Sequence, residues 1–461
     1  MEHGRSTPPC DLEHRLKTFL VIGGGASGVL VAAQLLAHPS TRQVVLFERH
    51  SELGAGVAYG TEHPGHLLNV PAIRMSAFPD DPEHFVGWLA SEPRWRPDGG
   101  WTPQSFVPRR LYRDYLSSLL EPCRKGGARS GRLVVVHDEV VDLAETPAGV
   151  EAISRNGDRY PGDAAVLATG NESPALPPAR WRHGFWASRW GFDIPSDATV
   201  AIIGTGLSMV DSVVSLLDAG HSGRIVAISR RGLLPRPHGA TRALPLDLAE
   251  IPFGCGLSHL AGWLRRRIRQ GGGDWRATID GLRPHTQRLW RELPLAEKQR
   301  FLRHARPWWD VHRHRMAPEV RARIDAARAS GQLTVLAGRL AGIDAHRDGV
   351  RLRFVARGTA AEQAMQAHHV IECRGQNADV GTTRNPLLGK LLRRGVVRPG
   401  PFRLGVDVAA DCAVTDARGA PSRRIFAVGP ITVGTFWEII AVPDIRQQAK
   451  TLAAYLAGAA G

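Results

Sequence analysis

The chain has 461 residues, more than one hydrophobic core ordinarily supports, so two or three domains are expected. Its 59 Lys and Arg residues outnumber its 44 Asp and Glu residues and give a formal net charge of +15. The basic residues are mostly Arg and are spread through the chain, which argues against nucleic-acid binding and fits anionic cofactors and a small anionic substrate. Biased codon usage would produce the same excess.

The sequence shows no membrane-spanning segment and no signal peptide. No apolar run approaches the length of a bilayer, and the polar first residues lack an apolar core. We therefore expect a cytoplasmic protein without a membrane partner. Composition says nothing about its oligomeric state.

Cysteine and histidine spacing predicts neither a metal centre nor a redox-active dithiol. His312 and His314 form an H-x-H pair, but no second ligand cluster accompanies it, so a polar wall is the better interpretation. The cysteines lie far apart without a C-x-x-C, which also excludes a disulfide framework. They are Cys10, Cys123, Cys255, Cys373 and Cys412.

The first glycine-rich loop follows an apolar strand at Phe19–Ile22 and opens directly into an apolar helix. Gly23, Gly25 and Gly28 give the pattern G-x-G-x-x-G. The first glycine permits a tight turn, the second lets backbone N–H groups approach a pyrophosphate, and the third lets helix and strand pack closely. The helix N-terminus attracts the negative charge.

An acidic residue completes this motif. Glu48 stands at the end of the next strand, Val44–Phe47, where a carboxylate accepts hydrogen bonds from an adenosine ribose and repels a 2′-phosphate. Strand, loop, helix, strand and acid in this order predict a dinucleotide site. A purely structural glycine turn is the alternative.

Residues 52–89 are too rich in Gly, Pro and His for regular structure and too apolar for a free linker, so we expect an ordered loop over the cofactor. Helical spacing then begins at Leu111, with Pro108 near the start. Arg109 and Arg110 stand there and predict either a phosphate contact or a solvated basic turn.

Short strands follow, and the last of them ends in the sequence A-T-G at Gly170. Such an ending recurs in flavoproteins with two dinucleotides, where the chain passes under the first cofactor and leaves its domain. Pro174, Pro177 and Pro178 then mark a linker. The expected strands are 133–136, 140–143, 149–155 and 164–168.

A second strand, glycine loop and helix begins near residue 200. Gly204 and Gly206 hold the first two glycine positions, whereas Met209 holds the third. The following strand, Ile225–Ile228, ends at Arg230 and Arg231 instead of an acid. Two arginines there grip a ribose 2′-phosphate and favour NADPH over NADH, unless they form a surface basic pair.

From about 235 to 330 the composition turns to Arg, Trp, His and Leu, which predicts a helical insertion in the second nucleotide domain. Strands are expected again at 333–336, 350–356 and 370–373. A buried strand at 425–428 leads to Gly429-Pro430 and to a long helix ending at Leu456. Trp437 and Glu438 are expected in the first turns of that helix.

The chain resembles the FAD/NAD(P)-binding proteins that include the bacterial FAD-dependent urate hydroxylases and, more distantly, amino-acid N-monooxygenases. Besides both glycine loops and the A-T-G ending, the resemblance rests on AYGTEHPGHLLNVPA, FVPRRLYRDYL, SRRGLLPRPH and VGPITVGTFWEIIAVPDIRQQ. It implies an α/β fold with two Rossmann-like dinucleotide-binding domains. The FAD domain comprises residues 1–195 and 369–461, and the NAD(P)H domain comprises 196–368 with the insertion.

The resemblance also implies the cofactor contacts. Two departures stand out: Gly429-Pro430 replaces the usual Gly-Asp at the ribityl contact, and residues 186–190 lack an expected His. The implied FAD residues are Gly23, Gly25, Ser27, Gly28, Glu48, Arg110, Gly170 and Gly429, and the implied NAD(P)H residues are Gly204, Gly206, Arg230 and Arg231.

The implied activity is an FAD-dependent monooxygenase that uses NAD(P)H and O2 to hydroxylate a small substrate, with urate, giving 5-hydroxyisourate, as first choice. The alternatives are N-hydroxylation of an amino acid or amine, an NAD(P)H-dependent flavoprotein reductase, and a redox-sensing protein without turnover. Asn69, Trp437 and Glu438 are the candidates for lining the flavin face, where the reaction takes place.

Overall fold

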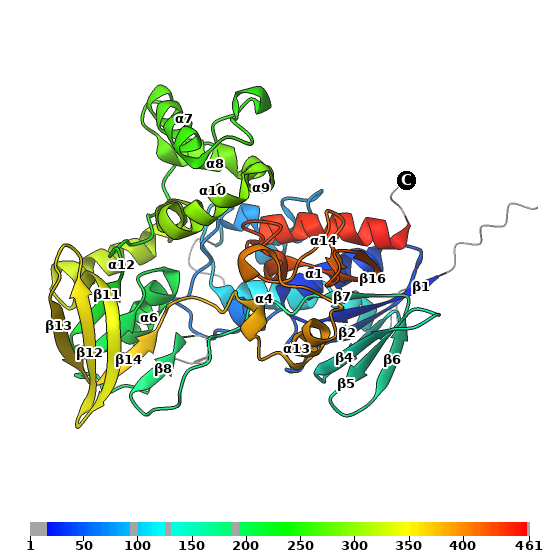
Figure 1. Cartoon of the computed structure of the whole chain (residues 1–461), viewed down its shortest axis with the longest axis horizontal. Coiled ribbons are helices and arrows are strands. Elements are labelled where there is room, and N and C mark those ends of the chain that lie inside the picture. Colours follow the sequence, from blue (N-terminus) through cyan, green and yellow to red (C-terminus); the bar gives the residue numbers. More distant parts are fainter. Residues whose placement is uncertain (1–15, 93–99, 125–130, 186–192, 459–461) are drawn as a thin grey trace, which may run out of the picture.

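The computed structural model describes residues 16–92, 100–124, 131–185 and 193–458. Two sheet-and-helix units lie next to each other, and a group of helices projects beyond them (Figure 1). This confirms the predicted α/β fold with two Rossmann-like units. The segment 186–190, where a His was expected, lies outside the described residues.

The first unit is built on a six-stranded sheet in the order β15-β16-β7-β1-β2-β3. Its strands are parallel except β15, which pairs antiparallel with β16. The central strands are apolar runs because both faces of a parallel sheet are buried. The strands are β1 (Lys17–Ile22), β2 (Thr41–Phe47), β3 (Leu133–Val136), β7 (Ala164–Leu167), β15 (Ala413–Thr415) and β16 (Pro421–Ala427).

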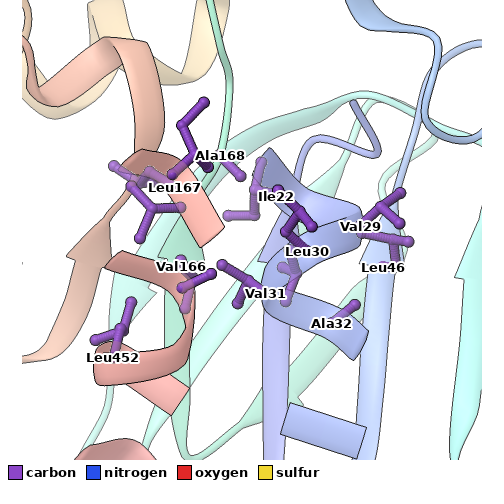
Figure 2. Close-up of a cluster of buried hydrophobic side chains, with 14 of the residues drawn as sticks. Ile22, Val29, Leu30, Val31, Ala32, Leu46, Val166, Leu167, Ala168 and Leu452 are labelled. Atoms are coloured by element: carbon purple, nitrogen blue, oxygen red, sulfur yellow. The ribbon is translucent and has the colours of Figure 1, made fainter. Parts of the chain in front are cut away.

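Two helices far apart in the sequence, α1 (Ala26–Ala37) and α14 (Val442–Ala457), pack together on this sheet. Figure 2 shows Leu452 of α14 and Val31 of α1 meeting near Val166 of β7. All three side chains are fully or almost fully buried. The end of the chain therefore completes the core that the first glycine loop begins.

The remaining elements of the first unit are short. A three-stranded antiparallel sheet consists of β4 (Val140–Glu145), β5 (Val150–Ser154) and β6 (Arg159–Gly162). Residues 52–89 are ordered, as predicted, and bury Leu68, Ala72 and Met75, but the expectation of irregular structure was wrong in part because short helices form within them. The other helices are α2 (Gly56–Tyr59), η1 (Ala72–Arg74), α3 (His84–Ser91), α4 (Arg109–Ser118), α5 (Glu121–Arg124), η6 (Val380–Thr382), α13 (Pro386–Arg393), η7 (Pro401–Arg403) and η8 (Gly429–Thr432).

The second unit has a seven-stranded sheet in the order β13-β12-β11-β10-β9-β14-β8. Its β8 to β11 portion is parallel, and β11, β12 and β13 form an antiparallel meander. Helices α6 (Leu207–Asp218) and α12 (Pro318–Ala329) pack together beside it. The strands are β8 (Arg182–Gly184), β9 (Val200–Ile203), β10 (Ile225–Ser229), β11 (Leu333–His346), β12 (Gly349–Ala356), β13 (Glu362–Ala367) and β14 (His369–Glu372).

Strand pairing shifts the predicted boundaries 1–195, 196–368 and 369–461. Both β8 and β14 hydrogen-bond within the second sheet, so that unit runs from about residue 180 to 373. Helix α12 connects the parallel strands β10 and β11, so it is a crossover of the nucleotide unit. The insertion predicted for 235–330 therefore ends before Pro318.

The insertion is a set of short helices with a small core of its own, formed by Ile251, Leu282 and Leu289. It also contacts the first unit, because the indole Nε1 of Trp290 donates to the carbonyl oxygen of Gly434 over 2.9 Å. Its helices are η3 (Leu248–Glu250), α7 (Leu257–Gln270), α8 (Trp275–Leu282), η4 (Arg283–His285), α9 (Thr286–Glu292), α10 (Leu295–Arg300), η5 (Phe301–Ala305) and α11 (Arg306–Arg313).

The last helix starts later than the sequence pattern suggested. It begins at Val442, so Trp437 and Glu438 precede it, and Glu438 has a left-handed backbone with φ of +66°. Pro443 was the overlooked signal, because proline favours the first helical turn, where its missing N–H costs nothing.

A buried polar contact joins the two units. Arg109 at the start of α4 pairs with Asp211 of α6, with 2.7 Å between Nη2 and Oδ2. His66 lies beside this pair: its Nε2–H donates to the carbonyl oxygen of Asp211 over 3.1 Å, and Nδ1 accepts from the hydroxyl of Thr61 over 2.7 Å. Because a carbonyl oxygen only accepts, the bond to Asp211 requires a proton on Nε2.

Burial, followed by the nearby positive charge of Arg109, lowers the pKa of His66 from 6.5 to about 3. Below pH 6.5 the unfolded chain therefore takes up a proton that the folded chain refuses, so stability present above pH 6.5 is lost on acidification. Between pH 7 and pH 5 the wild type should lose about 2 kcal/mol of its free energy of unfolding through His66, at ~1.4 kcal/mol per pH unit below pH 6.5. His66→Gln should lack this loss. Urea unfolding at each pH measures this, with the exposed His259→Gln as control. An unchanged pH profile in His66→Gln would contradict the assignment.

Candidate dinucleotide sites and the junction between them

The first loop is shaped by close backbone contacts. Gly23 has φ of +112°, and a Cβ there would lie 2.4 Å from the carbonyl oxygen of Ala168. A Cβ on Gly28 would lie 1.8 Å from the carbonyl oxygen of Gly23. Both glycines are therefore required by the protein itself, as the motif predicts.

Gly25 is required for a different reason. The nearest atoms to a Cβ on Gly25 are backbone atoms of Gly56, at 3.4 Å and 3.9 Å, which is ordinary contact. The protein therefore tolerates a side chain at position 25, in the space between Gly25 and Gly56. Gly25 also caps α1, which has no side-chain cap and no acid in its first turn. Its N–H groups and helix dipole suit a pyrophosphate.

A second observation fits a bound cofactor here. Thr169 of the A-T-G ending lies next to Gly23, and its buried Oγ1 has no hydrogen-bond partner among the described residues. Buried hydroxyl groups are normally satisfied, so this one is expected to meet a ligand. Gly170, which follows, has φ of +67° and open space around its Cβ position.

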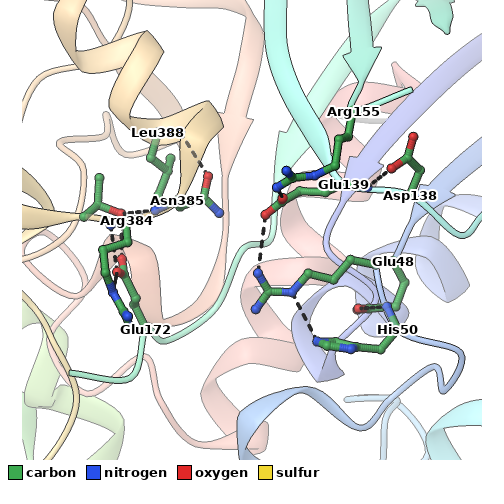
Figure 3. Close-up of polar contacts among 11 residues, drawn as sticks. Glu48, His50, Asp138, Glu139, Arg155, Glu172, Arg384, Asn385 and Leu388 are labelled. Atoms are coloured by element: carbon green, nitrogen blue, oxygen red, sulfur yellow. Dashed lines mark hydrogen bonds and ion pairs between the residues drawn. The ribbon is translucent and has the colours of Figure 1, made fainter. Parts of the chain in front are cut away.

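Glu48 is held in place by backbone donors. Its side chain is buried, Oε2 accepts from the N–H of Gly24 over 2.9 Å, and Oε1 accepts from the N–H of His50 over 3.0 Å (Figure 3). Each carboxylate oxygen retains a further acceptor site. The carboxylate is therefore fixed in orientation with acceptor sites left over, which is compatible with the ribose contact expected from its position after β2.

The structure explains why a glycine stands at position 429. Gly429 has φ of +73°, and a Cβ there would lie 2.3 Å from Oγ of Ser27 in the first turn of α1. Its N–H donates to Oε1 of Gln448 on α14 over 2.7 Å. Glycine is needed because the C-terminal loop lies directly on the first nucleotide loop. Arg110, in the first turn of α4, contacts the protein itself, because its Nη1 donates to the carbonyl oxygen of Glu62.

The second loop repeats the first with one change. Gly204 has φ of +116°, and a Cβ there would lie 2.3 Å from the carbonyl oxygen of Cys373, which follows β14. Gly206 faces open space, with nothing within 4 Å of a Cβ. Met209 is fully buried in the core of the second unit. This loop is also open to a dinucleotide.

The two arginines after β10 differ from each other. Arg230 is exposed and makes no hydrogen bond or ion pair with the described residues, so it remains available to a phosphate. Arg231 donates from Nη2 to the carbonyl oxygen of His304 over 3.2 Å, and its guanidinium lies 5.8 Å from the ring centre of Trp308. Arg231 therefore contacts the insertion.

The three flavin-face candidates lie at the junction of the units and the insertion. The carbonyl oxygen of Asn69 accepts from Nε2 of His238 over 3.0 Å. Burial lowers the pKa of His238 to about 4, so its ring is neutral at neutral pH. Trp437 stacks on Trp290, with ring centres 4.5 Å apart. Asn69 thus links the two units, and Trp437 faces the insertion.

Glu438 is held by the insertion. Its carboxylate accepts from the indole N–H of Trp309 through Oε1 and from Nε of Arg313 through Oε2, the latter over 2.9 Å. The side chain is 5% exposed. Glu438 therefore fixes the segment before α14 to the insertion, a role that the sequence pattern did not suggest.

Around Glu438 lies a cluster of charged residues that the sequence pattern missed, which we call the junction cluster. Its ion pairs are Arg283–Asp444 at 3.0 Å, Arg313–Glu438 at 2.9 Å, Arg74–Asp280 at 3.9 Å, and Arg315–Asp280. The only sequence signal was the density of donors near residue 310. The cluster comprises Arg74, Asp280, Arg283, Arg313, Arg315, Glu438 and Asp444.

Metal chemistry and membrane insertion receive no support from the part of the chain that the structure describes. No group of three or more His, Cys, Asp or Glu side chains within it could hold a metal ion. Every helix found in those same ranges is too short or too polar to cross a bilayer.

Comparison with known proteins supports the flavoprotein assignment. Residues 20–172 match the family model described as FAD-NAD(P)-binding. A search of curated protein sequences finds no match. The fold is similar to an ornithine N-hydroxylase from Kutzneria sp. 744, solved with reduced FAD, NADP+ and L-ornithine, at 14% identity and a TM-score of 0.65. The alignment covers 96% of this chain and 99% of that one.

Two further solved structures are similar over nearly their whole length. L-lysine 6-monooxygenase from Pseudomonas syringae shares 15% identity, with a TM-score of 0.65 and coverage of 96% and 99%. The FAD-bound cadaverine monooxygenase from Erwinia amylovora shares 11% identity, with a TM-score of 0.64 and coverage of 95% and 94%. The chain has the fold of the two-dinucleotide flavoproteins. FAD and NAD(P) are the ligands that the matching family model describes, in agreement with the two glycine loops.

The Gly25 geometry predicts a separable loss of flavin. We expect Gly25→Val to fold but to purify nearly colourless, because the side chain fills the pyrophosphate space without striking backbone closely. Gly206→Val is the matched control and should remain yellow while losing reduction by NADPH. Flavin absorbance per protein and circular dichroism measure both. Normal flavin content in Gly25→Val would refute the assignment.

The exposed Arg230 predicts a nucleotide preference. Arg230→Ala should weaken NADPH binding by about tenfold or more, while NADH is unaffected, because one charge-assisted contact to the 2′-phosphate disappears. Arg224→Ala, at the opposite end of β10, is the control. Rates of flavin reduction at varied nucleotide concentrations give the affinities. Equal effects on both nucleotides would make Arg230 a surface residue.

Proposed function

We propose that this protein is an FAD-dependent monooxygenase that uses NADPH and O2 to hydroxylate the nitrogen of a small amine or amino acid. The observation that carries the proposal is the match over 95–96% of this chain to hydroxylases of ornithine, lysine and cadaverine. Urate, the first choice from sequence resemblance, finds no counterpart among these structures. The N-hydroxylation alternative is better supported.

Some residues of this chain bind the cofactors, and others enclose the reaction site. The first loop and Glu48 hold FAD, and the second loop with Arg230 holds NADPH. When bound, reduced FAD supplies the activation of O2 for transfer of one oxygen atom. The overall reaction converts R-NH2, NADPH, H+ and O2 into R-NHOH, NADP+ and water.

The insertion is placed to close the reaction space. It is joined to the first unit through the Trp290–Gly434 hydrogen bond and the Glu438 contacts, and to the second unit through the Arg231 contact with His304. An insertion held in this way is suited to keeping water away from reactive species and to orienting the substrate.

A disulfide reductase is disfavoured by the thiols. Burial raises the pKa of both Cys373 and Cys412 to about 12, so neither is a thiolate at neutral pH. All cysteines among the described residues are free, and Cys123 is buried as well. The chemistry of dithiol exchange needs an accessible thiolate with a nearby partner.

The proposed activity is tested by coupled measurements of NADPH oxidation, O2 uptake and product. We expect an amine or amino acid to accelerate NADPH oxidation and to yield a hydroxylamine detectable by iodine oxidation, one per NADPH. Urate in the same assay should neither disappear nor accelerate oxidation. Consumption of urate would instead support urate hydroxylation as the activity. NADPH oxidation without any oxygenated product would exclude a monooxygenase for the panel tested.

A further inference from the structure

The junction cluster is unbalanced in charge. It holds four guanidinium groups and three carboxylates, so one positive charge is left without a counterion within the cluster. His238, which lies close by, is neutral and adds no compensation. Arg446 on α14 adds a positive charge near Asp444, whereas Arg306 on α11 is paired with Asp310 over 3.4 Å. Buried charges are normally paired, so this excess needs an explanation.

One guanidinium nitrogen in the cluster is also unsatisfied. The Arg313 side chain is 8% exposed, and its buried Nη2 has no hydrogen-bond partner among the described residues. A carboxylate oxygen of Asp444 lies 4.0 Å from this nitrogen, beyond hydrogen-bond distance. A buried donor of this kind is costly unless a ligand accepts from it.

Besides burial, repulsion among the arginines lowers the pKa of two of them. Burial, followed by the neighbouring charge of Arg313, lowers the pKa of Arg283 below its usual range. Burial likewise lowers the pKa of Arg315, with Asp280 opposing it and Arg313 and Arg74 contributing. A further anion near these groups would relieve the repulsion, whereas a cation would add to it.

The cluster is open on one side. The Arg74 side chain is 38% exposed, whereas those of Arg283, Arg313 and Arg315 are 14%, 8% and 2% exposed. Arg74 belongs to η1, which follows the loop that carries Asn69. A ligand therefore meets Arg74 first and the buried arginines behind it.

We infer that the junction cluster binds the carboxylates of an acidic amine substrate, with Arg74 at the mouth of the site and Arg313 Nη2 as the buried donor. The inference rests on the proposed function and names its substrate class. Guanidinium forks bind carboxylates in a bidentate manner, which suits an amine with two carboxylates. The substrates of the similar hydroxylases carry two amino groups instead, and a second ammonium would face an excess of arginines here.

The same cluster contains its own reporter of binding. Trp309 donates its indole N–H to Glu438, the carboxylate that also accepts from Arg313. Ligand binding to Arg313 changes the surroundings of Trp309 and its fluorescence. Binding is therefore measured on the FAD-loaded protein without turnover.

The test is a fluorescence titration of the FAD-loaded protein with aspartate, glutamate, ornithine, lysine, cadaverine and urate. We expect aspartate or glutamate to bind at least tenfold more tightly than the dibasic amines. Arg74→Gln should weaken that binding at least tenfold, and Arg74→Lys should restore part of it because the charge returns. Arg353→Gln is the control, since Arg353 has the same 38% exposure and also pairs with carboxylates.

Three outcomes would overturn the inference: dibasic amines binding as tightly as acidic ones, binding unchanged in Arg74→Gln, or equal losses in Arg74→Gln and Arg353→Gln. Tighter binding of urate than of aspartate or glutamate would show that the cluster prefers a different anion. That result would also overturn the inference. Because the titration needs no oxygen transfer, acidic amines that bind without yielding a hydroxylamine would refute the proposed function alone.

Discussion

One backbone constraint is repeated at both nucleotide loops, and the layout of the molecule depends on it. The first glycine of each loop adopts a left-handed backbone directly against a carbonyl group at the end of the adjacent strand, Ala168 for Gly23 and Cys373 for Gly204. A Cβ would come within 2.4 Å and 2.3 Å of the two oxygens. The chain therefore leaves each sheet beside its own nucleotide loop.

The two loops differ in how tightly helix and strand pack. In the first, Gly28 touches the carbonyl of Gly23 so closely that no side chain fits. In the second, Met209 occupies the equivalent position and is buried among the side chains of α6 and its neighbours. Glu48 after the first loop and Arg230 after the second give the two sites opposite charge, and the proposed assignment of FAD to the first and NADPH to the second rests on this difference.

Charge is concentrated where three distant parts of the chain meet. The loop with η1, the insertion and the segment before α14 contribute Arg74, Arg313 and Glu438 to one cluster. Within a buried region such charges interact strongly and water screens them little. The cluster itself accounts for one of the 15 net positive charges, because its four arginines meet three carboxylates.

The sequence by itself determined the elements whose cause is local. Both glycine loops, Glu48 and Arg230 follow from backbone conformation and from spacing within about thirty residues, so their positions were predictable. The apolar strands of both sheets were found for the same reason. The short or polar strands β6, β8, β13 and β15 were missed because they carry little apolar pattern.

Only the tertiary structure decided the features that depend on distant partners. Glu438 meets Arg313 and Trp309, which lie 125 and 129 residues earlier, so its contact with the insertion leaves no local pattern. The pairing of β14 with β9 likewise moved the unit boundaries. Charge pairing between remote segments depends on how the chain folds back on itself, and sequence spacing carries no record of it.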